Sequence, residues 1–210
     1  MGQYVPMPRS LGSSRMEAFS DGVFSIASTL LVLDIALRPP GSPLEQLRHE
    51  WPGYLGYVVS FLTIGAAWLG HSALTDRLDH SDSLLVRINI LLLLVVAFLP
   101  FPTKLIAESL RDTNAERNYV TVYGLTLLTI HLLIYALDAY ARREHLYSQA
   151  QEGDELRRER RTLWPVVLGY AIAIAIGIVA PTVAVLGYLA LALYLVLPFR
   201  DLRRLLSRRS

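Results

Sequence analysis

The chain has 210 residues, of which 53% are hydrophobic and only 18% are charged, and its formal net charge is +2. It contains no cysteine, which excludes disulfides, thiolate metal sites and cysteine nucleophiles. The apolar residues form long runs and are not spread at the spacing of an amphipathic soluble fold. Length and composition therefore predict a single multi-pass membrane domain over residues 1–210.

The first apolar run, residues 14–37, is unusually polar for a membrane span. Arg15, Glu17 and Asp21 lie at its beginning, and Asp34 lies near its end. Ionisable groups at membrane depth are costly and usually turn toward protein or a water-filled cavity. We therefore expect the first helix not to face lipid, and we expect a permeation path to follow it.

A helical projection of this run separates two faces. At 100° per residue, one apolar stripe with Thr29 at its edge consists of Phe19, Gly22, Ile26, Leu30, Leu33 and Leu37. The small polar residues Asp21, Ser25 and Ser28 gather on another side. The stripe therefore either packs among the other spans or lines an axis formed by several copies of the chain.

Five more apolar runs follow, over residues 53–74, 84–104, 119–141, 163–179 and 182–199. Each has about the length that crosses a hydrocarbon core. Pro100 and Pro102 predict that the third span bends or ends at the outer interface, and Pro181 predicts a tight hairpin between the last two spans. We therefore expect an all-α membrane protein with six transmembrane helices per subunit.

The positions of the basic residues predict the orientation. With a cytoplasmic N-terminus, the outer loops hold only Arg38, Arg48, Lys104, Arg111 and Arg117. The inner segments hold Arg9, Arg15, Arg77, Arg87, Arg142, Arg143, Arg157, Arg158, Arg160, Arg161, Arg200, Arg203, Arg204, Arg208 and Arg209. The positive-inside rule then favours a cell-membrane protein with both termini in the cytoplasm. Anionic lipid headgroups account for the basic clusters better than nucleic acid, because no soluble domain presents them.

A polar cluster is expected near the cytoplasmic end of the second span. Trp68 and His71 lie three residues apart and share a helix face. Because the first helix begins at the same end, Arg15, Ser20 and Asp21 are expected to meet them in a buried network. For His71, a packing role with one satisfied ring nitrogen explains the position equally well.

The sequence predicts neither an enzyme nor a cofactor. It has no P-loop, no His/Glu set at metal-binding spacing, and no Ser/Lys or Asp/Asp pair placed for hydrolysis in the membrane. The pattern also shows no repeated halves and no helices broken at the bilayer centre, which are typical of secondary transporters. A secondary or proton-coupled transporter is the alternative to a channel.

The motif Arg15-x-x-x-Phe19-Ser20-Asp21 at the start of the first span resembles the signature of the transmembrane protein 175 family of potassium channels. Thr63, Trp68 and His71 in the second span, and Asn89 with Pro100-Phe101-x-Thr103 in the third, extend the resemblance. The resemblance implies a homotetramer with a central pore lined by the first helix of each subunit. It also implies a structural network that holds the first helix in place and consists of Arg15, Phe19, Ser20, Asp21, Trp68 and His71.

The resemblance further implies where potassium ions would pass. The narrow hydrophobic constriction falls on Ile26, with further apolar rings at Leu30 and Leu33, and a hydroxyl layer falls on Thr29. Thr29 and Leu30 stay alternatives for the pore-facing position. An apolar ring offers no oxygen to replace hydration water, so modest selectivity for potassium over sodium is expected to follow from the cost of dehydration.

Overall fold

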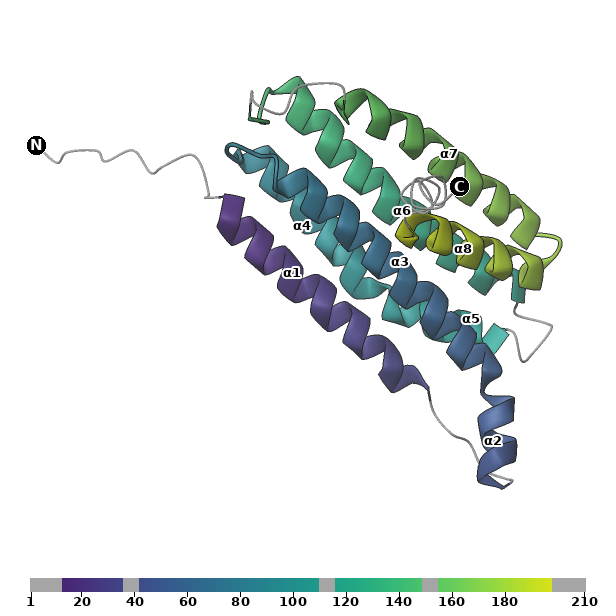
Figure 1. The fold of residues 1–210 in the computed structure, drawn as a ribbon. Coiled ribbons are helices and arrows are strands. Elements are labelled where there is room, and N and C mark those ends of the chain that lie inside the picture. Colours follow the sequence, from purple (N-terminus) through teal and green to yellow (C-terminus); the bar gives the residue numbers. More distant parts are fainter. Residues whose placement is uncertain (1–12, 36–41, 110–115, 149–154, 198–210) are drawn as a thin grey trace, which may run out of the picture.

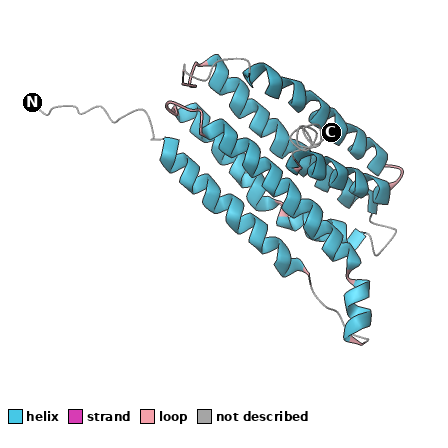
Figure 2. Cartoon of the chain, viewed as in Figure 1, coloured by secondary structure: helices cyan, strands magenta, loops and turns pink. Residues whose placement is uncertain are grey.

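The computed structural model describes residues 13–35, 42–109, 116–148 and 155–197, and the regular elements within these ranges are all helices (Figure 2). In chain order they are α1 (Ser13–Leu30), the 3₁₀ turn η1 (Leu31–Asp34), α2 (Pro43–His49), α3 (Trp51–Thr75), α4 (Ser83–Phe98), α5 (Pro100–Ser109), α6 (Glu116–Arg143), α7 (Glu155–Gly177) and α8 (Pro181–Val196). The prediction of an all-helical protein is confirmed.

Within the described residues, four helical stretches are long and apolar enough to cross a membrane: Ser13–Leu33, Trp51–Thr75, Ser83–Glu108 and Arg117–Arg143. Pro165–Gly177 and Pro181–Val196 are apolar but shorter, with 10–17 residues each. Within the described residues, these two fall short of the length that crosses a full hydrocarbon core. The chain is therefore a multi-pass membrane protein with four full-length candidate spans and a shorter apolar hairpin.

The helices are arranged so that α1 lies along one edge of the molecule (Figure 1). α1 packs against α3 and α4, whereas α6 packs against α4, α5 and α7. α8 lies against α3, α6 and α7, and α7 forms the edge of the bundle opposite α1. Because the helices that contact α1 all lie on one side of it, α1 keeps a face that none of the described residues covers.

Prolines interrupt the helices at the expected places. α4 ends at Phe98, and α5 begins at Pro100 and continues through Pro102, so the third span breaks at this point and resumes. The chain turns between Gly177 and Pro181, and the resulting α7–α8 hairpin is tightly packed. The predicted helix stop at residues 38–41, Leu37, and the basic residues of segments 1–12 and 198–210 lie outside the described residues.

A cluster of buried tyrosines joins α6 to α7 and α8. The rings of Tyr123 and Tyr170 lie 5.7 and 6.2 Å from the ring of Tyr188. The α6 backbone approaches this cluster at Gly124, where an added Cβ would lie 2.1 Å from the Tyr188 hydroxyl oxygen. Glycine is therefore required at this position by close packing. The Tyr123 hydroxyl also meets Ser60 Oγ of α3 at 2.7 Å, which ties the two halves of the bundle together.

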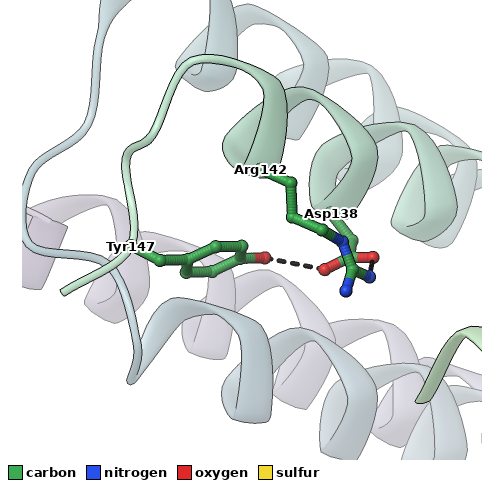
Figure 3. Close-up of polar contacts among 3 residues, drawn as sticks. All are labelled: Asp138, Arg142 and Tyr147. Carbon is green, nitrogen blue, oxygen red and sulfur yellow. Dashed lines mark hydrogen bonds and ion pairs between the residues drawn. The ribbon is translucent and has the colours of Figure 1, made fainter. Parts of the chain in front are cut away.

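Polar contacts fasten the α3–α4 connection to the end of α6. Leu78 and Tyr147 form an isolated antiparallel bridge between the two connections. The Tyr147 hydroxyl donates a hydrogen bond to Asp138 Oδ1 at 2.8 Å, and Arg142 lies against the same carboxylate (Figure 3). Nearby, the Tyr140 hydroxyl donates to Asp82, whose carboxylate also accepts the Leu85 amide and caps α4. These contacts hold together the end of the bundle at which α3 and α6 end and α4 begins.

Candidate functional site

The buried face of α1 holds the helix on its subunit. It consists of Met16, Ser20, Phe24, Ala27 and Leu31. These residues recur at three- and four-residue intervals, so they form one stripe along the helix. The stripe packs against α3 and α4 and fixes the rotation of α1 about its own axis.

The opposite face of α1 is apolar and open. Phe19 and Ile26 are each 61% exposed, Leu33 is 74% exposed and Leu30 is 42% exposed. Thr29 is exposed as well, and its hydroxyl donates to the carbonyl of Ile26 in its own helix. The structure therefore turns the predicted stripe out of the subunit and leaves both Thr29 and Leu30 on the open side.

The helix changes its geometry within the stripe. The α-helical part ends at Leu30, and residues 31–34 form the 3₁₀ turn η1, whereas the sequence predicted one α-helix up to residue 37. In a 3₁₀ turn, side chains three residues apart eclipse one another and each residue rises about 2.0 Å. Leu33 therefore stands directly above Leu30. From Ile26 to Leu33 the stripe is about 12 Å long, with four α-helical steps followed by three 3₁₀ steps.

A hydrogen-bonded network centred on Asn89 holds the N-terminal half of α1. Ser20 Oγ donates to the carbonyl of Met16 at 2.8 Å, so it accepts the 2.9 Å hydrogen bond from Asn89 Nδ2. The Asn89 carbonyl oxygen is then free to accept a hydrogen bond from His71 Nε2, which lies 2.8 Å away. The histidine is 1% exposed, and its ring packs on Phe24 with 5.5 Å between the ring centroids. One continuous chain of donors thus links α3, α4 and α1.

A second contact lies beside this network. The indole nitrogen of Trp68 donates to Asp21 Oδ1 at 2.8 Å. Trp68 is partly exposed and His71 is buried, so the face that the sequence assigned to both residues is divided between the surface and the core. The physical reason is that two residues three positions apart on a helix differ by about 60° in direction. This difference is enough to place Trp68 and His71 on either side of α1.

In the structure Ser20 and His71 both bond to Asn89, and Asp21 bonds separately to Trp68. Arg15 and Phe19 lie apart from both contacts. Phe19 points outward on the open face. Arg15 is exposed and has no ion-pair partner among the described residues. On the helical projection, Arg15 lies only about 20° from Ile26, so it continues the open stripe toward the N-terminal end of α1.

A groove between α1 and α3 marks the third face of α1. It has a volume of about 470 Å³ and is lined by Asp21, Phe24, Ser25, Ser28, Phe61, Ile64, Gly65 and Trp68. The small polar residues that the sequence placed away from the stripe therefore line this groove. α1 has three distinct faces: one buried in the subunit, one open and apolar, and one bordering the groove.

Sequence reasoning missed the central role of Asn89. The residue entered only as part of the family resemblance and was not assigned to the network. The available signal was a lone amide in the apolar run of the third span, because a buried polar group in a membrane needs a partner. The contact between Phe24 and His71 had no such signal, since it depends on how α1 and α3 are rotated.

The described residues contain no group of three or more His, Asp or Glu side chains that could hold a metal ion. The site consists instead of one helix of an all-helical membrane protein. Polar contacts hold α1 on one side, and its open face is apolar and exposed. That arrangement is typical of an ion-channel subunit.

The comparisons with known proteins identify the family. The model of the family described as "Endosomal/lysosomal potassium channel TMEM175" matches residues 15–100. A potassium channel of Streptomyces collinus is 37% identical over 186 residues, which cover 87% of this chain and 90% of that protein. The chain belongs to the TMEM175 family.

Two further relatives extend the comparison. The crystal structure of a lysosomal potassium-selective channel TMEM175 homolog from Chamaesiphon minutus superposes with a TM-score of 0.75 at 31% identity, covering 87% of this chain and 95% of that one. A TMEM175 protein of Gallus gallus, named an endosomal/lysosomal proton channel, is 37% identical over 123 residues, which cover 53% of this chain but 25% of that protein.

Proposed function

We propose that the chain is a potassium channel formed by four copies, with the open face of α1 from each copy lining a central pore. The observation that carries this proposal is the exposure of Ile26, Leu30 and Leu33 on a helix whose other two faces are packed or polar. A helix with ionisable residues is poorly suited to face lipid. When four such helices surround an axis, their apolar faces line that axis and their remaining faces contact protein.

In this arrangement Ile26 forms the narrowest ring, and Leu30 and Leu33 continue it outward. The rings offer no oxygen to a passing ion, so hydration water must be shed or carried through. Potassium holds its water less tightly than sodium, and the proposed result is modest selectivity for potassium. Thr29 borders the rings at about 60° from Ile26 and is the nearest hydroxyl to the proposed path.

The subunit in this proposal is a single domain over residues 1–210 with six membrane helices. α1, α3, α4 with α5, and α6 are the long ones, and α7 and α8 form a shorter hairpin. An even number of spans places both termini on the same side, and the excess of arginine in the inner segments makes that side the cytoplasm of a cell-membrane protein. No cofactor and no catalytic step are part of the mechanism.

Ion flux from purified protein in liposomes tests the proposal, with potassium and sodium gradients compared. Ile26→Asn is the critical variant, because four amides at the ring would retain water and lower the barrier for sodium more than for potassium. We expect a larger flux and a permeability ratio closer to one. Ile172→Asn is the matched control, since Ile172 is also exposed but lies on α7, on the other side of the molecule from α1 (Figure 1).

Three outcomes can be distinguished. A potassium-selective flux that Ile26→Asn alters and Ile172→Asn leaves unchanged supports both the channel and the constriction. A selective flux that neither variant alters retains the channel but refutes Ile26 as its constriction. Flux that requires a second ion gradient favours the secondary or proton-coupled transporter instead. The name of the chicken relative makes protons the second ion to measure in the same liposomes.

A further inference from the structure

The groove between α1 and α3 contains groups that lipid would satisfy poorly. Asp21 lines it with a carboxylate, and Ser25 and Ser28 line it with hydroxyls beside Gly65 and Trp68. Near its cytoplasmic end, Glu17, Asp21 and Asp76 are close enough to interact electrostatically. These like charges at one end of an otherwise apolar groove favour an occupant that is apolar along its length and basic near its cytoplasmic end.

The exposed face of α4 has this chemistry. Its members recur at three- and four-residue intervals and are Leu84, Arg87, Leu91, Leu94 and Phe98. Arg87 makes no ion pair within the described part of the chain. On the helical projection it lies about 160° from Asn89, which points into the subunit, so the Arg87 face points away from α1 and α3.

The two surfaces also lie at matching depths. Asn89 bonds to both Ser20 and His71, so these three residues mark one level of the bundle. Glu17 lies three residues from Ser20 toward the cytoplasm, about 4.5 Å, and Arg87 lies two residues from Asn89, about 3 Å. A rotation about the membrane normal preserves depth. Arg87 of a neighbouring copy therefore arrives within about 2 Å of the level of Glu17.

The groove and the exposed face of α4 also lie in matching directions around α1. Taking the open stripe at Ile26 as 0°, Ser20, which bonds to Asn89 of α4, lies at about 120° on one side, and the groove residues Asp21, Ser25 and Ser28 centre near 130° on the other side. When the stripes of several copies face one axis, the groove of each copy is turned toward the α4 face of the next. Such a head-to-tail contact between unlike surfaces is what closes a ring.

We propose that the α1/α3 groove of each subunit receives the exposed α4 face of the neighbouring subunit, with the neighbour's Arg87 against the Glu17, Asp21 and Asp76 carboxylates. This inference rests on the proposed tetramer and identifies the surfaces that build it. The contact would press on α1 from the side opposite its own α4, so the neighbour helps to set the rotation of the pore helix.

A charge exchange tests the ionic part of the contact. Arg87→Glu and Glu17→Arg should each lower the tetramer-to-monomer ratio in detergent by about five-fold, and the double variant should restore most of it. Arg48→Glu on α2 is the control for a change of charge alone, because Arg48 is exposed outside this contact. Two single variants that lose tetramer without rescue in the double variant would overturn the pairing.

Disulfide formation between introduced cysteines tests the packing. The sequence has no native cysteine that could form a competing disulfide. Ser25 lies five residues from Ser20 and Leu94 five residues from Asn89, both toward the outer side, so the two positions share a level. Co-expressed Ser25→Cys and Leu94→Cys chains with different tags should crosslink to each other. A Ser25→Cys and Leu84→Cys pair, offset by about 15 Å, should not.

The results separate this inference from the proposed function. Crosslinking at the matched pair together with charge rescue supports the contact. A wild-type tetramer that shows neither effect overturns the contact and leaves the channel intact, with lipid as the occupant of the groove. A wild-type protein that never assembles beyond a monomer overturns the tetramer itself, whatever the variants do.

Discussion

Replacing Asn89 with leucine should destabilise the subunit more than any other single change in the network. The substitution keeps the approximate volume but removes both interhelical hydrogen bonds, the one from His71 Nε2 and the one to Ser20 Oγ. Interhelical hydrogen bonds in membrane proteins contribute about 0.6 kcal/mol each on average and up to about 1.7. His71 would then have no partner at either ring nitrogen, because Nδ1 already lacks one within the described residues. An unfolding free energy lower by about 1–3 kcal/mol is expected.

The comparison with Ser20→Ala makes the prediction specific. Of the two bonds between helices, that variant removes only the one from Asn89 Nδ2 and leaves the His71–Asn89 bond in place, so about half the loss is expected. Ser25→Ala is the matched control on the same helix, because Ser25 is exposed, and it should change stability by less than about 0.5 kcal/mol. Unfolding in mixed micelles with increasing SDS, followed by circular dichroism, measures all three. If Ser20→Ala costs as much as Asn89→Leu, the network is not organised around Asn89.

Two further predictions concern the scaffold. Gly124→Ala should lower stability by about 1–3 kcal/mol, because its Cβ would lie 2.1 Å from the Tyr188 hydroxyl oxygen. Gly70→Ala should not, because its Cβ would lie 3.9 Å from Ile134 Cγ2, at ordinary contact distance, and the same SDS titration compares the two variants. Asp82→Ala should cost about 0.5–2 kcal/mol by removing the cap of α4. Partial burial raises the pKa of Asp82, but hydrogen bonds from Tyr140 and the Leu85 and Leu84 amides outweigh it and leave the pKa below its ordinary value. The carboxylate therefore stabilises the fold above its unfolded-state pKa, and this contribution is lost as the pH falls through the lowered value. An unfolding series from pH 7 to pH 3 should show the wild type approaching Asp82→Ala, and a constant gap would refute the assignment.

Hydropathy and helix periodicity were sufficient to predict the helical membrane fold, the break near Pro100 and the α7–α8 turn. They also placed Ile26 and Leu33 on one stripe, because a single helix determines which of its own residues share a face. Periodicity could not decide how that helix is rotated against its neighbours. The separation of Trp68 from His71, the isolation of Arg15 and the central position of Asn89 all depend on packing between helices. The change to 3₁₀ geometry after Leu30 has no marker in the local sequence, which is a uniform run of leucine and valine with Asp34 at its end.

The polar contacts that hold α1 against α3 and α4 come from residues outside the open stripe. This separation affects how the sequence of α1 can vary. The side chains that hold the helix in place and the side chains proposed to meet the ion occupy different positions of the same segment, α1 with η1. A substitution at Ile26 or Leu30 removes no hydrogen bond between helices, and a substitution at Ser20 adds nothing to the open face. The surface proposed to line the pore can therefore change, by natural drift or by protein engineering, while the contacts that hold the helix are kept.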